Sequence, residues 1–382
     1  MLTVIIFILI LGLLVFVHEL GHFLIERRNG VTVEEFGFGF PPRIFGIKRR
    51  GTIYSINWIP LGGFVKITGE DGEPSYVPPG GTSAGKEREN PKSFASKSPF
   101  TRIRILVAGV AMNFLLAAVL FSVGFWKGVP QLAEEVRGGS VRSEKIQIVE
   151  VGKNTPAETM GFRTGDEIFG AVGPDGNLAK FFSVEDVQNF ARVNQGREVD
   201  LLIRRGKEEL KLTGMPRAEY PEGEGPLGVA LAKTAEVRYP WYQAIWKGIE
   251  YTFNITITFV AFLFVMLWRL IISQPIELDV SGPVGIAVLT GQVARLGFDY
   301  LLRFTAVLSV NLAIINILPI PALDGGRVLF ILIEKFKGSP VSQKFEQRAH
   351  NFGFALLITL MILVTFRDIM KFDLAEKVKD LF

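Results

Sequence analysis

The sequence contains no cysteine and only three histidines among its 382 residues. Without cysteine there is neither a disulfide framework nor a thiolate metal site, so any metal must be held by nitrogen and oxygen ligands. The net charge is only +4, and the basic residues lie beside apolar runs instead of forming one tract. This distribution argues against nucleic-acid binding and favours control of membrane topology.

Hydrophobic residues make up 48% of the chain, and many of them are gathered in long runs. Four runs have roughly the length that crosses a hydrocarbon core as a helix: 2–25, 105–126, 304–323 and 352–366. The first run resembles a signal-peptide core, but no basic residue precedes it and a His-Glu pair stands where a cleavage site would be, so we expect it to be retained. The sequence therefore predicts a polytopic α-helical membrane protein with four transmembrane helices.

A fifth apolar run, 251–268, is flanked by Trp246, Trp268 and Arg269, as is typical of a helix in the membrane interface. Basic residues follow the first span, precede the second and follow residue 323, which places these ends inside. The N-terminus and residues 127–240 then lie outside, and an odd number of crossings must lead back to the basic loop at Arg327. Because residues 304–323 supply one crossing, we expect 251–268 not to cross.

Residues 138–216 have the composition of a compact soluble domain. We predict strands at 146–151 and after 165–168, a short helix opening at Thr155, a second helix at 184–194, and pairing of 199–203 with 208–212. This order resembles a circularly permuted PDZ domain; another small α+β module is the alternative, because no ligand-binding loop is identifiable. We assign an extracytoplasmic PDZ-like domain to 127–217, and a linker with the interfacial helix to 218–300.

Residues 31–68 alternate between apolar and polar in places. Segments 53–58 and 64–67 are interpreted as the two strands of a hairpin, separated by a break at 60–63. Apolar strands between spans predict a β-hairpin region that re-enters the membrane, where protein or a water-filled cavity must cover the backbone groups. A cytoplasmic loop at 69–100 and the second span complete a first membrane half, 1–126, and residues 301–382 form the second half.

The most specific motif is His18-Glu19-Leu20-Gly21-His22, inside the first apolar run. The i, i+4 spacing puts both imidazoles on one face of a helix, where they can bind one zinc ion. The alternative is that these polar groups only hydrogen-bond neighbouring helices. It is disfavoured because ionisable groups inside a span are costly and usually functional.

A zinc hydrolase normally has three protein ligands and keeps a fourth position for water, so a third ligand is required. Asp324 is the strongest candidate, because it follows the third apolar span at its inner end, where His18 and His22 are also expected. Alternatively, Asp324 ends a helix and Gly325 and Gly326 form its C-cap turn.

Glu19 is expected to act as the general base on water at the zinc site and to pass the proton to the leaving amine. A helical substrate must be unwound before its peptide bond can be attacked. Pro319 and Pro321 break the helix before Asp324, Asn316 offers a side-chain amide, and the hairpin offers a strand edge for β-addition. Each feature also has a structural alternative: a kinked span, a bond to a neighbouring helix, and a plug.

Together these motifs resemble the site-2 proteases, in particular the bacterial members that regulate sigma-E and sigma-W. The motifs stand in family order over nearly the whole chain: residues 18–22, 37–40, 60–66, 281–285 and 311–326. The resemblance implies a multi-pass protein of the bacterial cytoplasmic membrane that uses zinc in stress-response proteolysis. Its implied substrates are single-span membrane proteins, such as anti-sigma factors already cut by another protease, or signal-peptide remnants.

The resemblance also implies substrate-binding roles for six residues: Asn316, Pro319, Gly37, Gly39, Gly62 and Gly63. The implied partners are the bilayer, these substrates, and a peptide or protein ligand of the PDZ-like domain. The chain departs from the family at residues 109–113, where a proline is missing although Asn113 is present, and it has room for only one PDZ module.

Two other classes compete with the protease. A membrane scaffold or chaperone could carry the same motifs around a vestigial metal site, although every expected zinc and base residue is present. A metal-ion transporter would need polar residues along several spans, and these are sparse outside the two motifs.

Overall fold

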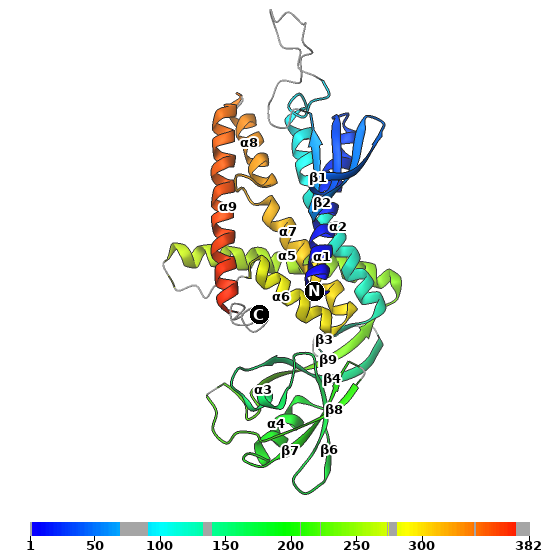
Figure 1. Ribbon diagram of the computed structural model, residues 1–382, viewed down its shortest axis with the longest axis vertical. Helices are drawn as coiled ribbons and strands as arrows, with labels where there is room; N and C mark the ends of the chain where they lie inside the picture. Colours follow the sequence, from blue (N-terminus) through cyan, green and yellow to red (C-terminus); the bar gives the residue numbers. More distant parts are fainter. Residues whose placement is uncertain are drawn as a thin grey trace, which may run out of the picture. The chain divides into compact units, whose positions relative to one another are not determined.

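The computed structural model describes residues 2–68, 91–132, 140–206, 208–221, 223–272, 274, 281–339 and 341–371 (Figure 1). The chain forms two compact units. Unit 1 comprises Met1–Phe121, Gly248–Arg295 and Tyr300–Phe382, and unit 2 comprises Ser122–Lys247 and Leu296–Asp299. Residues 69–90 of the predicted cytoplasmic loop lie outside the described residues.

In the described part of the chain, five helices are long and apolar enough to cross a membrane. They are α1 (Leu2–Arg28), α2 (Pro99–Lys127), α5 (Trp241–Ile271), α7 (Phe298–Ile317) and α9 (Gln343–Lys371). Helices α1, α2 and α9 contain the predicted spans 2–25, 105–126 and 352–366, α7 contains the first part of the predicted span 304–323, and α5 contains the predicted interfacial run. Length and composition do not separate α5 from the others, so its place in the interface stays a prediction.

The helix that corresponds to the third predicted span, 304–323, ends earlier than the sequence predicts. Helix α7 ends at Ile317, a loop occupies residues 318–323, and α8 (Asp324–Lys337) begins at Asp324. The loop contains Pro319 and Pro321, which lack a backbone N–H and clash with the preceding helical turn. The two prolines therefore explain why the helix stops before Asp324.

Helix α1 packs closely on α2 inside unit 1, and the absence of a side chain at Gly21 permits this. A methyl group at Gly21 would overlap the carbonyl of Ala108. Helix α7 contacts the same region, because the Ser309 hydroxyl donates a hydrogen bond of 2.8 Å to the carbonyl oxygen of Asn113. Small residues at membrane-helix interfaces let backbones approach in this way, and the contacts place α1, α2 and α7 around one point.

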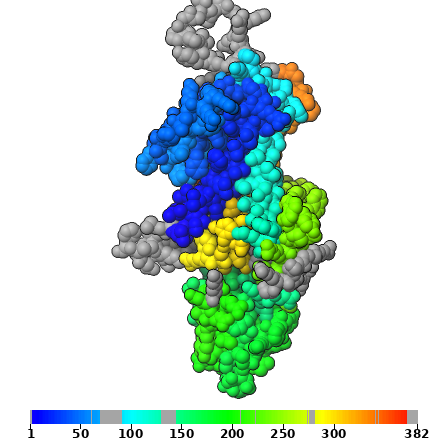
Figure 2. Space-filling model, turned by 90° about the vertical axis from the view of Figure 1, so that its right-hand side faces the viewer, coloured from blue at the N-terminus to red at the C-terminus, as the bar shows by residue number. Residues whose placement is uncertain are grey.

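The sheet of β1 (Val33–Arg49) and β2 (Thr52–Ile67) contacts α1 and protrudes beside it as a blue surface in Figure 2. The two strands turn at residues 50–51, where Arg49 pairs with Thr52. The first part of β1 then pairs with both parts of β2: Phe36 lies opposite Val65 and Tyr54. The predicted hairpin of 53–58 with 64–67 is therefore wrong, because residues of β1 lie between these segments and the turn is at 50–51 instead of 60–63.

Unit 2 is built on a seven-stranded sheet of order β3-β9-β4-β5-β7-β8, with β6 paired to β5. Its strands are β3 (Val129–Leu132), β4 (Ser140–Val151), β5 (Glu167–Val172), β6 (Leu178–Lys180), β7 (Val199–Arg205), β8 (Glu208–Gly214) and β9 (Val229–Arg238), and its helices include α3 (Pro156–Met160) and α4 (Val184–Val193). The strands and helices predicted between 146 and 212 are all present. Strand β9 lies in the stretch assigned to a linker, and it pairs with β4 along Val229–Arg238.

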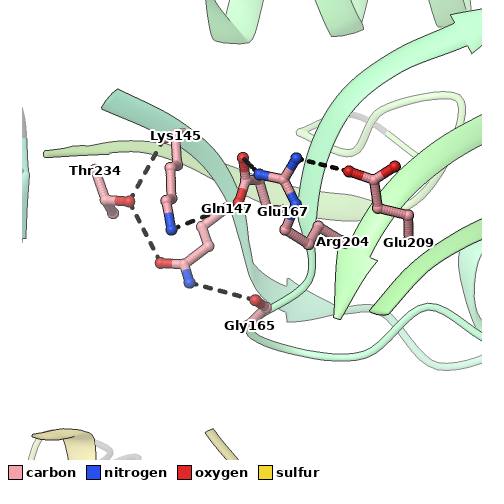
Figure 3. A network of polar contacts seen from close by, with 7 residues as sticks. All are labelled: Lys145, Gln147, Gly165, Glu167, Arg204, Glu209 and Thr234. Atoms are coloured by element: carbon pink, nitrogen blue, oxygen red, sulfur yellow. Dashed lines mark hydrogen bonds and ion pairs between the residues drawn. The ribbon is translucent and has the colours of Figure 1, made fainter. Parts of the chain in front are cut away.

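Apolar side chains of the sheet and of α4 form the core of unit 2. Ile148, Ile168, Leu201 and Ile203 are almost fully buried and pack with Val187 of α4. On another part of the sheet, polar side chains form a chain of contacts across five strands (Figure 3). Glu167 of β5 binds Lys145 of β4 at 3.6 Å and Arg204 of β7 at 3.1 Å, and Arg204 also binds Glu209 of β8 at 2.8 Å.

We predict that Asp166→Ala destabilises unit 2 by about 2–4 kcal/mol. The Asp166 side chain is 1% exposed, and its two oxygens accept hydrogen bonds of 2.7 Å from Arg205 and one of 2.8 Å from the Arg163 amide. The hydrogen bond with Asp166 raises the pKa of the Arg205 guanidinium. Without Asp166 the guanidinium remains charged, because the ordinary pKa of arginine is far above neutral pH. Hydrogen exchange of β5 and β7 amides in the full-length protein measures the loss.

The control is Asp175→Ala, which removes an exposed carboxylate from a turn of the same unit. It should change protection by less than about 0.5 kcal/mol. Equal protection in the two variants would show that the buried ion pair contributes nothing measurable.

Candidate metal centre

His18 and His22 lie on one face of α1, as their spacing predicts. They are 6% and 8% exposed, and their ring centroids are 4.7 Å apart with the rings nearly perpendicular. The two Nε2 atoms are 3.1 Å apart. Two imidazole nitrogens therefore point at the same small volume inside unit 1.

Asp324 reaches the same volume from α8. Its Oδ2 lies 3.0 Å from His18 Nε2 and 3.4 Å from His22 Nε2. Asp324 is the first residue of α8, and Gly325 and Gly326 are buried in the first turn of this helix. The alternative of a helix end at Asp324 with a glycine C-cap is therefore wrong: the glycines are needed because a methyl at either one would overlap backbone carbonyls of residues 317–320.

The three ligand atoms form a triangle with edges of 3.0, 3.1 and 3.4 Å. In a tetrahedral site with metal–ligand bonds of about 2.0–2.2 Å, ligand atoms lie about 3.3–3.6 Å apart. The observed edges approach these values, and the donor set of two imidazoles and one carboxylate matches catalytic zinc sites that leave one position open. In the described part of the chain this is the one cluster of its kind, with all ligand atoms within 4.8 Å.

Neighbouring groups orient the two rings. His22 Nδ1–H donates a hydrogen bond of 2.9 Å to the carbonyl oxygen of Ile105, which leaves the Nε2 lone pair for a ligand. His18 Nδ1 lies 3.4 Å from the side-chain amide of Asn113, a residue with no exposed surface. In the sequence, Asn113 stands out only as a position shared with the family. Its helical spacing from Gly109 could have placed both residues on one face of α2.

Gly109, which the sequence marks only as part of the segment 109–113, also lies at the site. A methyl group there would overlap His22 Nε2 and lie 2.8 Å from His18 Cε1. Glycine at this position therefore keeps α2 from filling the space that the imidazole nitrogens face.

Glu19 is half-buried and faces the β-sheet. A methyl at Gly63 would lie 3.7 Å from Glu19 Cγ, so Gly63 adjoins the expected base. The other predicted glycines have packing reasons: Gly37 fits against Phe64 and Ser55, Gly39 has φ of +81° close to the Ile59 carbonyl, and Gly62 has φ of +146° against Val15. Gly63 thus lies beside the predicted catalytic base, Glu19.

Asn316 and Pro319, the remaining predicted substrate-binding residues, lie at different distances from the centre. The Asn316 amide nitrogen is 3.4 Å from His18 Nε2, so the structure brings this side chain to the three ligands. Pro319 is exposed in the loop after α7.

Two buried histidines and a half-buried aspartate between apolar helices form the donor set of a catalytic zinc site. A family model described as Peptidase family M50 matches residues 6–360. Zinc metalloprotease RasP of Oceanobacillus iheyensis is 33% identical, over 97% of this chain and 99% of the relative. Regulator of sigma-W protease RasP of Bacillus subtilis is 32% identical, over 97% of this chain and 98% of the relative.

The chain therefore belongs to peptidase family M50, the site-2 protease family. The expectations of a zinc cofactor and of a zinc metalloprotease are confirmed by this membership. Together with the five candidate spans, it also makes the chain a membrane protein.

We predict that Gly109→Ala lowers zinc affinity by at least about tenfold, because the added methyl pushes His22 out of position. Alanine is otherwise favoured over glycine inside a helix by about 1 kcal/mol, so a loss must come from the site and not from helix propensity. Zinc content and affinity of the purified full-length protein measure the effect.

Gly12→Ala is the matched control on α1. Its added methyl would lie 3.4 Å from the Phe38 ring and from the Pro60 carbonyl oxygen, which is an ordinary van der Waals distance. If Gly109→Ala binds zinc as tightly as Gly12→Ala, the space beside the imidazoles is not reserved for a metal.

Proposed function

We propose that the chain is an intramembrane protease in which His18, His22 and Asp324 bind zinc and Glu19 is the general base. The observation that carries the proposal is the triangle of ligand atoms with edges of 3.0–3.4 Å. The donor atoms come from helices α1 and α8, and α1 is long and apolar enough to span a bilayer. Hydrolysis would therefore occur at membrane depth.

Zinc, when bound, lowers the pKa of a water ligand to about 7 and polarises the substrate carbonyl. Glu19 directly follows a ligand and lies beside Gly63, where it can accept a proton and return it to the leaving amine. The Asn316 amide lies next to His18 and can donate a hydrogen bond to an unwound substrate backbone.

We assign the β1–β2 sheet to a position in which it re-enters the membrane beside the metal centre. Its outer half exposes large apolar side chains: Phe40, Ile44, Phe45, Ile47, Ile56, Trp58 and Ile59. Such an exposed apolar surface is expected to face lipid or substrate. The strand edge at Gly63–Ile67 begins next to Glu19, so a substrate added to this edge as a strand would pass the catalytic residues.

Unit 2 is assigned to the extracytoplasmic side of a bacterial cytoplasmic membrane, on the basis of the distribution of basic residues. Its strand and helix order supports a PDZ-like module with a peptide or protein ligand. The Bacillus subtilis relative is named regulator of sigma-W protease. On this basis we assign single-span anti-sigma factors, already cleaved by another protease, as the substrate class.

We predict that Glu19→Gln retains zinc and fold but slows cleavage of a co-expressed single-span membrane substrate at least on the order of a hundredfold. Glutamine keeps the shape of the side chain but cannot accept the proton. Immunoblotting of the intact and cleaved substrate, with zinc content measured on the same preparation, gives the result. Glu185→Gln, an exposed residue of unit 2, is the control.

Undiminished cleavage by Glu19→Gln would contradict the assignment of the base. Loss of zinc together with cleavage would assign Glu19 to metal binding instead.

The topology makes a separate prediction, which the absence of native cysteine makes easy to test. Single cysteines at Gln274, after α5, and at Asp175, in unit 2, should both react with a membrane-impermeant maleimide from outside. A cysteine at Ser98, before α2, should react only after permeabilisation. If Gln274→Cys behaves like Ser98→Cys, helix α5 crosses the membrane.

A further inference from the structure

The third histidine of the chain, His350, lies outside the metal centre but contacts the loop that leads to Asp324. Its Nδ1 accepts a hydrogen bond of 2.9 Å from the backbone N–H of Ala322. His350 belongs to α9, so this contact joins the last described helix to the loop between α7 and α8.

Ala322 has a backbone conformation that is unfavourable for alanine. Its φ is +81°, in the left-handed region that glycine usually occupies. The Leu323 N–H donates a hydrogen bond of 3.1 Å to the Ile320 carbonyl, which closes a turn with Pro321 and Ala322 at its centre. Proline followed by a positive φ is typical of a type II turn, where the second position prefers glycine. The turn therefore needs stabilisation from outside itself.

Helix α9 supplies this stabilisation from one side and α8 from the other. A methyl at Gly353, one turn after His350, would overlap the carbonyl of Pro321. On the α8 side, a methyl at Gly326 would overlap the carbonyl of Ile320. In Figure 1 α8 and α9 run side by side, and the His350 and Phe330 rings are 5.6 Å apart. The turn thus packs against both helices, and it ends at Leu323, directly before Asp324.

We propose that His350 is a positioning residue for Asp324: by holding the Ala322 N–H it fixes the turn that places the Asp324 carboxylate 3.0 Å from His18 Nε2. This inference rests on the proposed role of Asp324 as a metal ligand. Residues that orient ligands from outside typically contribute about 10–100-fold to metal affinity.

The test compares zinc affinity of the full-length protein with His350 replaced by Asn, Leu or Gln, by competition with a zinc chelator. Asparagine places an acceptor oxygen near the position of Nδ1. Leucine has nearly the shape of asparagine but no acceptor, and glutamine carries its acceptor one bond further from the backbone. We expect His350→Asn to stay within about threefold of the original affinity, and His350→Leu and His350→Gln to lose at least about tenfold. Circular dichroism and size-exclusion chromatography verify folding, and if His350→Leu does not fold, the Asn and Gln pair decides.

Asp324→Asn in the same assay separates the two claims. If it weakens zinc binding while His350→Leu and His350→Gln do not, the metal site stands and the role of His350 is overturned. If all three His350 variants lose affinity equally, the ring packing against Phe330 is what matters, and the proposed hydrogen bond is likewise overturned. If Asp324→Asn binds zinc normally, the proposed ligand set itself fails.

Discussion

The approach of the Asp324 carboxylate to the two imidazoles joins parts of the chain that are 306 residues apart in sequence. A carboxylate buried among apolar helices is costly unless positive charge or hydrogen-bond donors surround it. One divalent ion shared by the three side chains, as we propose, would satisfy all of them at once. On this proposal the metal centre sets the relative position of α1 and α8, and α2, α7 and the loop before Asp324 must leave room for it.

Glycine provides that room. Gly21 brings α1 against α2, Gly109 leaves the volume before the imidazoles open, and Gly325 and Gly326 fold the start of α8 onto the end of α7. Glycine inside a helix is less favourable than alanine by about 1 kcal/mol, so these helices trade intrinsic stability for close approach. Tight packing is also what lets a contact on α9 affect a carboxylate on α8, because a packed interior transmits small displacements.

Much of the site was predictable because its signals are local or topological. The i, i+4 spacing put His18 and His22 on one face, and the depth of two spans brought Asp324 to the same level. The strand order of residues 33–67 was not predictable, since alternation does not say which segment pairs with which. The roles of Gly109, His350 and β9 were not predicted for a similar reason. Each depends on a contact with a residue far away in the sequence, and hydrophobic periodicity carries no information about such contacts.

The central claim, that one zinc ion is shared by α1 and α8, is tested most directly by anomalous diffraction at the zinc absorption edge from crystals of the full-length protein. The account predicts a single strong peak about 2.0–2.2 Å from His18 Nε2, His22 Nε2 and an Asp324 carboxylate oxygen. A zinc peak bound to other residues, or one on the histidines with the Asp324 carboxylate several ångströms away, would contradict it.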